Sequence, residues 1–178
     1  MKLSIFISVL VALTFLLNSC ENYPEYPDTP QVLFKDIRIT DTIDVLDNQL
    51  KMAFLTLTVI DGDGDLGLSP SDTAFPFQQN GENYYNLYIE MYGKKNQVFS
   101  KIDFIVPLYY RFPYIPKSNE QVQSVKADMI VAIENDLNKI DFDTVIYKIV
   151  IKDRTLNASD TAVSPEIYKN LTPPYNKK

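Results

Sequence analysis

Regular alternation of apolar and polar residues is the dominant pattern of this chain, and it predicts β-strands. The clearest run is 53–60, in which alternate residues are apolar and threonines lie between them. Segments 85–91 and 145–151 repeat the pattern. Because successive side chains of a strand point to opposite faces, each segment would bury one face and leave the other toward water.

Shorter or less regular runs predict further strands. Residues 34–39 indicate a first strand, and Gly93-Lys94-Lys95-Asn96 is typical of a hairpin turn that leads into a strand over 97–104. Residues 163–167 predict a short last strand. Pro165 would limit it to the edge of a sheet, because proline has no N–H to donate.

Segment 122–137 fits two periods. Its apolar residues alternate as in a strand, but Val122, Val125, Met129, Ile133 and Leu137 also recur at helical spacing. We favour the strand, because the β-branched residues in this segment suit a sheet.

These segments add up to about seven strands separated by turn-rich connections, with no other segment that predicts a helix. The expected fold is therefore all-β, a single β-sandwich of the immunoglobulin or fibronectin type.

The N-terminus has the features of a bacterial lipoprotein signal peptide. Lys2 precedes an uncharged, mostly apolar run over 3–17, and Leu17-Asn18-Ser19-Cys20 follows. The run is shorter than a membrane-spanning helix needs to be. A small residue before a lone cysteine resembles the lipobox, which implies that Cys20 becomes the acylated first residue of the mature chain. An ordinary secretory signal is the alternative.

The expected organisation is a signal peptide over 1–19, a proline-rich tether over 20–31, a β-sandwich over 32–171 and a flexible tail over 172–178. Cleavage before Cys20 would leave 159 of the 178 residues, with 16 basic and 23 acidic side chains and a net charge of −7. This acidic balance argues against a nucleic-acid partner.

Composition narrows the possible chemistry. Cys20 is the only cysteine, so the chain has no internal disulfide, and there is no histidine. Catalysis by Ser-His-Asp or Cys-His groups and the usual zinc sites are therefore excluded. A hydrolase with two carboxylates has no isolated acidic pair to use, so we expect a protein that is not an enzyme.

One loop carries a candidate metal site. Asp61, Asp63 and Asp65 alternate with glycines directly after the strand that ends at Ile60. Carboxylates spaced in this way can surround one hard cation, and Ca²⁺ is the first candidate because it accepts 6 to 8 oxygen ligands at flexible geometry. The alternative is that the Asp-Gly pairs only make tight turns.

Two more aspartates are candidate ligands. An EF-hand counted from Asp61 would place its last ligand at Asp72, but position 6 is Leu66 instead of glycine and a strand precedes the loop. We therefore interpret the loop as a calcium site at the end of a sheet. In a sandwich the 153–160 loop would lie at the same end, where Asp153 would complete the shell and Arg154 would pair with an acid such as Asp72.

The sequence also resembles a known group of proteins. The segments that carry the resemblance are the Asp-Gly run with Asp72-Thr73, the Arg111-Phe112-Pro113-Tyr114-Ile115-Pro116 stretch, and residues 147–159 with Asp153-Arg154, Asn157 and Ser159. They are similar to Bacteroidota lipoproteins without an established activity. The resemblance implies one immunoglobulin-like domain held at the outer membrane by its lipid.

A second candidate site is aromatic. Tyr109, Tyr110 and Tyr114 lie among prolines, and their rings would stack on sugars if they were exposed and coplanar. The alternative is that they cover an edge of the sandwich.

Two functions follow. The first is a calcium-stabilised binding or structural module that is attached to the membrane and contacts an envelope protein. The second is a glycan-binding accessory lipoprotein of a polysaccharide-uptake system.

Overall fold

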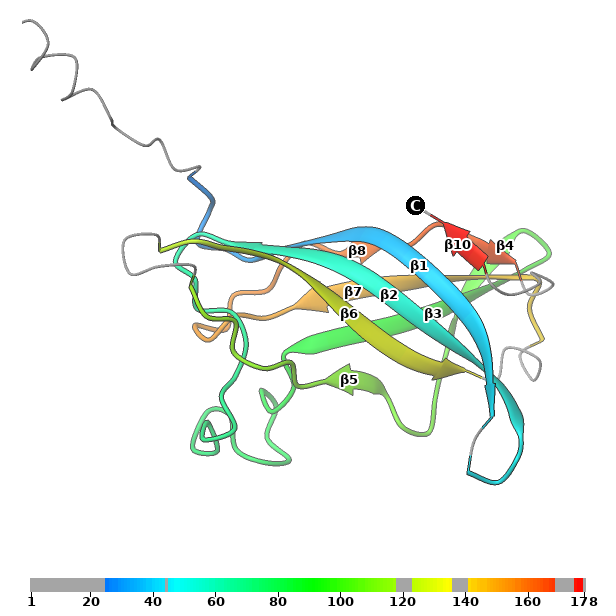
Figure 1. Ribbon diagram of the computed structural model, residues 1–178, viewed down its shortest axis with the longest axis horizontal. Coiled ribbons are helices and arrows are strands. Elements are labelled where there is room, and N and C mark those ends of the chain that lie inside the picture. Colours follow the sequence, from blue (N-terminus) through cyan, green and yellow to red (C-terminus); the bar gives the residue numbers. More distant parts are fainter. Residues whose placement is uncertain (1–24, 44, 118–122, 136–140, 169–174, 178) are drawn as a thin grey trace, which may run out of the picture.

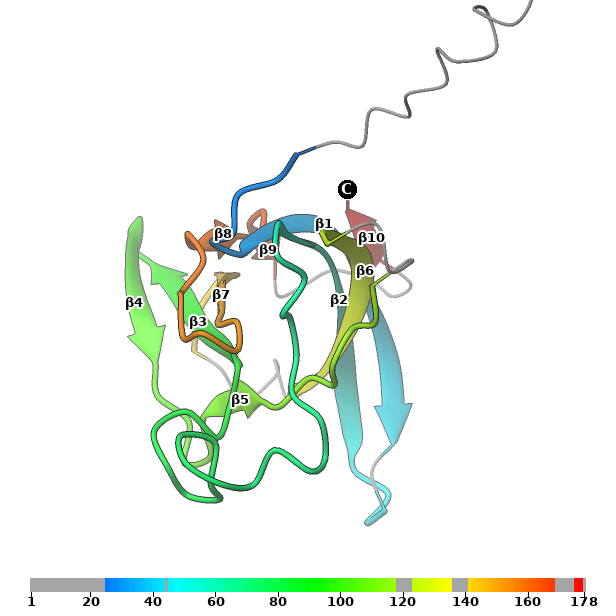
Figure 2. The same ribbon diagram turned by 90° about the vertical axis from the view of Figure 1, so that its left-hand side faces the viewer.

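The computed structural model describes residues 25–43, 45–117, 123–135, 141–168 and 175–177. Within them the chain forms ten strands and no helix, in two antiparallel sheets that pack face to face (Figures 1 and 2). The expected all-β sandwich is confirmed. The strands are β1 (Gln31–Ile43), β2 (Gln49–Asp61), β3 (Leu87–Lys95), β4 (Val98–Ile102), β5 (Leu108–Tyr110), β6 (Val125–Asn135), β7 (Thr144–Ile151), β8 (Ala162–Val163), β9 (Ile167–Tyr168) and β10 (Tyr175–Lys177).

The first sheet has the order β10-β1-β2-β6, and β1 and β2 form its long central hairpin. The second sheet has the order β4-β3-β7-β8, with β5 also paired to β3 and β9 also paired to β7. Both β2 and β7 run toward the end of the sandwich at the left of Figure 1. The loops that follow Asp61 and Ile151 therefore start at the same end.

The core forms between the inner faces of the two sheets. Leu55, Leu57 and Val59 of β2 are fully buried, and they belong to the same core cluster as Ile149 and Tyr147 of β7. Each such aliphatic side chain contributes about 1.5–3 kcal/mol by leaving water. The alternation in the sequence is thus the alternation between core and surface.

Segment 122–137 forms a strand where the structure describes it, over β6. Val131 and Ile133 are buried while Ile130 and Ala132 are exposed, which is the expected two-residue period. All eleven residues of β6 pair with β2. The strand was the correct choice because this period places one face of β6 on the core.

The predicted hairpin turn at 93–96 is wrong in position. Gly93 lies inside β3, and the turn is made by Asn96 and Gln97, which both have positive φ. Two residues with positive φ form the tight turn that matches the twist of a hairpin. Gly93 is needed for another reason, because a side chain there would collide with the ring of Phe142.

The predicted last strand is divided in two. β8 and β9 lie on either side of Pro165 and pair separately with β7. Between them Ser164 donates its N–H to the carbonyl of Tyr147 at 2.9 Å and accepts the N–H of Tyr147 on its hydroxyl at 2.9 Å. Tyr85, which the sequence placed on a strand, lies before the start of β3.

Candidate functional site

The candidate site is the acidic loop at the end of β2. Asp61, Asp63 and Asp65 each offer a carboxylate oxygen, and these three oxygens lie within 4.8 Å of one another. Asp61 is fully buried and the other two are half-buried. The sequence-predicted triad is therefore brought together as one cluster.

One oxygen of each carboxylate has no hydrogen-bond partner among the described residues. These are the buried Oδ1 atoms of Asp61, Asp63 and Asp65. The other oxygen of Asp61 accepts the backbone N–H of Asp65 at 2.9 Å, which closes the loop on itself. A buried oxygen without a donor costs free energy, so three of them in one place form a site that a cation would satisfy.

The carboxylates also disturb one another's ionisation. Burial, followed by the interaction with the neighbouring carboxyl group of Asp63, raises the pKa of Asp61 to about 7. Burial and the charge of Asp153 raise the pKa of Asp65. Without a cation the cluster therefore resists full ionisation at neutral pH, and a bound cation would remove that resistance.

The glycines of this loop make room for other segments of the chain. A side chain at Gly62 would collide with the carbonyl of Tyr26. At Gly64 it would collide with the carbonyl of Gln123, and at Gly67 with that of Pro113. Three segments therefore converge on the loop, which is more than a tight turn would require.

Backbone hydrogen bonds join the end of the acidic loop to the segment 112–115, which lies between β5 and β6. The backbone N–H of Leu68 donates to the carbonyl of Phe112 at 3.1 Å. The N–H of Tyr114 donates to the carbonyl of Leu68 at 3.2 Å, and the N–H of Ile115 donates to the carbonyl of Leu66 at 3.0 Å. These bonds fix the acidic loop against the segment that follows β5.

Asp153 lies in the neighbouring loop, as expected. It is buried and accepts hydrogen bonds from the backbone N–H of Asn157 at 2.7 Å, from the Asn157 side-chain amide at 2.9 Å and from the Thr155 hydroxyl at 3.0 Å. The backbone N–H groups of Arg154 and Thr155 lie near enough to the Asp65 carboxylate to lower its pKa, which partly offsets the effects of burial and of Asp153. The two loops thus meet, while Asp153 itself holds its own loop in shape and stands outside the three-residue cluster.

Asp72 forms the ion pair that the sequence proposed for it. Its Oδ2 accepts a hydrogen bond from Arg154 Nη1 at 2.6 Å and another from the backbone N–H of Ser69 at 2.7 Å. Arg154 lowers the pKa of Asp72 below its ordinary value. The structure therefore places Asp72 with Arg154 and outside the cluster.

A polar hollow of about 460 Å³ borders the cluster. Its lining includes Asp65, Ser69, Ser71, Tyr114, Lys117 and Arg154. Lys117 donates to the side-chain carbonyl of Gln123 at 2.6 Å. The hollow combines hydroxyls, two cations and one exposed aromatic ring beside the acidic loop.

The three candidate tyrosines are not one surface. Tyr109 and Tyr114 are exposed, whereas Tyr110 packs against the core and burial raises its pKa. Tyr109 instead joins two tyrosines that sequence reasoning missed, Tyr88 at a ring-centroid distance of 5.0 Å and Tyr85 at 6.1 Å, with interplanar angles of 67° and 60°. These inclined rings do not form a flat stacking platform.

Arg111 and Asn86 are two organising residues that the sequence did not reveal. Arg111 donates to the carbonyls of Tyr84 at 2.9 Å, Asp72 at 2.7 Å and Ser69 at 3.1 Å. Buried Asn86 donates to the carbonyl of Phe112 at 3.2 Å and accepts its N–H at 2.8 Å. Both hold irregular backbone in place, and irregular backbone has no periodic signal.

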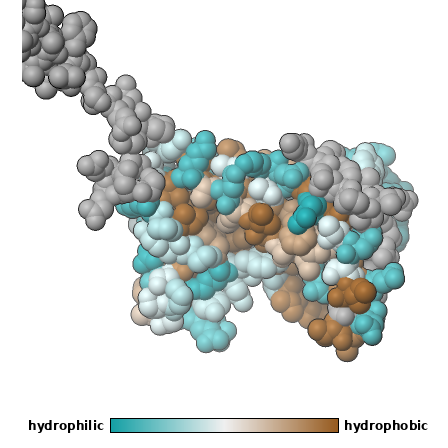
Figure 3. All heavy atoms as spheres, in the orientation of Figure 1, coloured by the Kyte–Doolittle hydropathy of each residue, from teal (hydrophilic) through white to brown (hydrophobic). Residues whose placement is uncertain are grey.

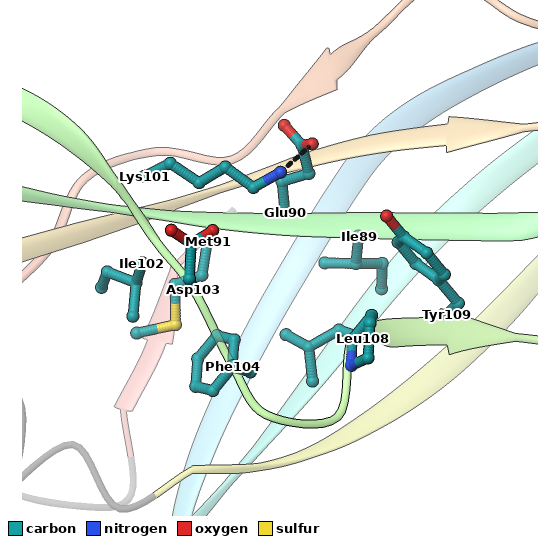
Figure 4. Close-up of a pocket in the computed structure, with 10 residues that line it drawn as sticks. Ile89, Glu90, Met91, Lys101, Ile102, Asp103, Phe104, Leu108 and Tyr109 are labelled. Atoms are coloured by element: carbon teal, nitrogen blue, oxygen red, sulfur yellow. Dashed lines mark hydrogen bonds and ion pairs between the residues drawn. The ribbon is translucent and has the colours of Figure 1, made fainter.

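A smaller cavity of about 150 Å³ lies between β3, β4 and β5 (Figure 4). Ile89, Leu108 and Phe104 form apolar lining, and Lys101 at the rim donates to Glu90 at 2.6 Å. The cavity has about a third of the volume of the hollow beside Asp65, so it offers a ligand less room.

No protein-family model, no curated protein and no solved structure matches this chain. The resemblance to Bacteroidota lipoproteins therefore stays a prediction. Cys20 lies outside the described residues, and within the part that the structure describes no helix could cross a membrane.

Proposed function

We propose that this chain is an outer-membrane lipoprotein whose β-sandwich binds Ca²⁺ at Asp61, Asp63 and Asp65. The bound ion stabilises one end of a binding or structural module that is not an enzyme. The observation that carries the metal is the convergence of three partly or fully buried carboxylates, each with an oxygen that no described residue satisfies.

The donor set favours Ca²⁺ over Mg²⁺. Three aspartates converge on one position, whereas Mg²⁺ is usually held by one or two carboxylates and several waters. Transition metals prefer nitrogen or sulfur ligands, and the chain has no histidine and a single cysteine. The remaining ligands of the ion would be backbone carbonyls or water.

The test is calorimetry with Ca²⁺ together with thermal melts in excess Ca²⁺ and in chelator. Binding to the folded state alone stabilises by about 2.7 kcal/mol at a free concentration of about 100 times the dissociation constant. Asp63→Asn should remove most of this gain. In chelator the same variant should melt above the wild type, because it removes one of three repelling charges.

Asp47→Asn is the matched control. Asp47 is exposed, lies outside both acidic loops and has a φ of 63°, which asparagine tolerates. Its Ca²⁺-dependent gain should equal that of the wild type. Equal melting of the wild type with and without Ca²⁺, with no heat of binding, would reject the metal site.

Anchoring through Cys20 needs its own test. The lipobox-like Leu17-Asn18-Ser19-Cys20 supports acylation, and firm anchoring takes two or more acyl chains. Cys20→Ser should move the protein from the membrane fraction to the soluble fraction. Equal retention of that variant would reject the lipid anchor.

Glycan binding is a second candidate, favoured by the hollow beside Asp65. Tyr114 is 41% exposed there, next to hydroxyl groups and to Lys117. A glycan array with the wild type and Tyr114→Ala tests it, with Tyr110→Phe as a control at a side chain packed on the core. Binding that Tyr114→Ala leaves unchanged would exclude this hollow as the site.

A further inference from the structure

We infer that ion binding at the acidic loop fixes the segment 25–30 against the sandwich, and that loss of the ion releases it. The inference rests on the proposed Ca²⁺ site and adds a role for Gly62. Figures 1 and 2 show this segment approaching the sandwich at the end where β2 stops.

The contact is made by the residue between two of the candidate ligands. Gly62, which separates Asp61 from Asp63, donates its N–H to the carbonyl of Pro27 at 2.9 Å. A Cβ on Gly62 would collide with the Tyr26 carbonyl and lie 2.7 Å from the Pro27 carbonyl carbon. The backbone of 26–27 therefore rests directly on the peptide that the two carboxylates flank.

Gly62 is present to make this approach possible. Its φ is outside the left-handed region, unlike those of Gly64 and Gly67 at 67° and 84°. Any residue would adopt the Gly62 backbone conformation, so the absence of a side chain serves the contact with Tyr26 and Pro27. The loop is thus shaped to receive the preceding segment.

The contact depends on the position of the carboxylates. Without a cation, the carboxylates of Asp61 and Asp63 repel each other. Both residues are joined to Gly62 by peptide bonds, so this repulsion acts on the position of the Gly62 backbone. One hydrogen bond adds only a small net stabilisation, which is too little to hold the segment on a loop that opens. With a cation, the peptide of Gly62 is fixed from both sides and its N–H stays aimed at Pro27.

The segment has a natural pivot. Pro30, directly before β1, is buried, whereas Glu25, Pro27, Asp28 and Thr29 are exposed. Release at Gly62 would leave Pro30 as the last fixed point before the sheet. The expected lipid anchor at Cys20 precedes this segment. The ion would therefore determine how the anchored domain is oriented relative to the membrane surface.

The chain has no tryptophan, so Tyr26→Trp supplies a single fluorescent reporter in the segment. The experiment uses the full mature lipoprotein in detergent and measures acrylamide quenching of the reporter indole in chelator and with added Ca²⁺. We expect Ca²⁺ to reduce the quenching constant by about twofold, because it closes a locally open segment. Tyr168→Trp, in β9 beside the start of β7, is the matched control and should show no change.

Gly62→Ala in the Tyr26→Trp background locates the effect. This variant keeps all three carboxylates but pushes 26–27 away, so calorimetry should still detect Ca²⁺ while the quenching response is lost. A thermal melt establishes that the variant is folded.

The outcomes separate the two proposals. If neither the wild type nor the Tyr26→Trp protein takes up Ca²⁺, both the proposed function and the inference are rejected. Ca²⁺ uptake with unchanged quenching of the reporter rejects the inference alone. Persistence of the response in a Ca²⁺-binding Gly62→Ala variant also rejects it, because the contact would then lie elsewhere.

Discussion

Arg154 forms a two-point ion pair with Asp72, 82 residues earlier in the chain, with Nη1 to Oδ2 at 2.6 Å and Nη2 to Oδ1 at 3.3 Å. The pair connects the loop after β7 to the loop after β2. It lies next to the acidic cluster without belonging to it, so its contribution to stability can be measured separately.

A double-mutant cycle with Asp72→Asn and Arg154→Met should give a coupling energy of about 1 kcal/mol. This value is at the upper end for exposed pairs, because the geometry is bidentate and both side chains are at most about a third exposed. The measurement is denaturant unfolding of the four proteins. The more exposed Lys101–Glu90 pair is the control and should couple more weakly. Additive effects at Asp72 and Arg154 would contradict the prediction.

In chelator, the free energy of unfolding should fall as the pH rises from about 4 to about 7. The pKa of Asp61 is about 7 in the folded chain against an ordinary value of 3.8. Between these values the folded state holds a proton that the unfolded state has lost, so rising pH favours unfolding. Saturating Ca²⁺ should reverse the slope, because the ion replaces that proton.

The pH prediction is checked by denaturant titrations at several pH values with the wild type and Asp61→Asn. Asparagine does not titrate, so the difference between the two proteins isolates the carboxyl group. A difference that stays constant with pH would show that Asp61 ionises normally.

Gly67→Ala should destabilise the fold by about 2 kcal/mol or more. The substitution forces alanine to a φ of 84° and drives its Cβ into the Pro113 carbonyl. Gly81→Ala is the comparison, because φ there is not positive and its nearest contact is Gln78 in an exposed loop. Denaturant unfolding measures both, and equal losses would argue against the tight approach at Gly67.

Asn86→Ala should cost about 2–4 kcal/mol, because it leaves the buried N–H of Phe112 without its acceptor and removes one of two donors to the Phe112 carbonyl, the other being the N–H of Leu68. Asn83→Ala is a suitable control, since Asn83 accepts a hydrogen bond from Lys152 at 3.2 Å in a partly exposed position. Unfolding midpoints would compare the two variants. A loss at Asn86 no larger than at Asn83 would mean that other donors replace the amide.

The sequence predicted those parts of the fold in which one face of a strand meets the core. β2, β6 and β7 were found because burial imposes a two-residue period on their side chains. The turn at Asn96 and Gln97 was misplaced because Gly93 looked like a turn residue, although the glycine is required by the ring of Phe142. Packing of this kind leaves no local signal.

The candidate site, too, was predicted only in part from the sequence. Asp61, Asp63 and Asp65 were recognised because all three carboxylates lie within five residues of the sequence. The convergence of Pro27, Gln123 and Pro113 on the same loop was not predicted, because each contact joins segments far apart in the chain. The tyrosine cluster around Tyr88 was missed for the same reason.

The position of β6 has a consequence for behaviour at high concentration. It is the outer strand of its sheet, and among the described residues only β2 pairs with it. A free strand edge is a template for another chain, and charged side chains are the usual protection against such association. Lys126, Asp128 and Glu134 are exposed along this edge, but Ile130 between them is 68% exposed. Neutralising these charges would first reduce solubility, with little change in the melting temperature of the dilute protein. The apolar tip of the β1–β2 hairpin, where Figure 3 shows hydrophobic surface, would add to this tendency.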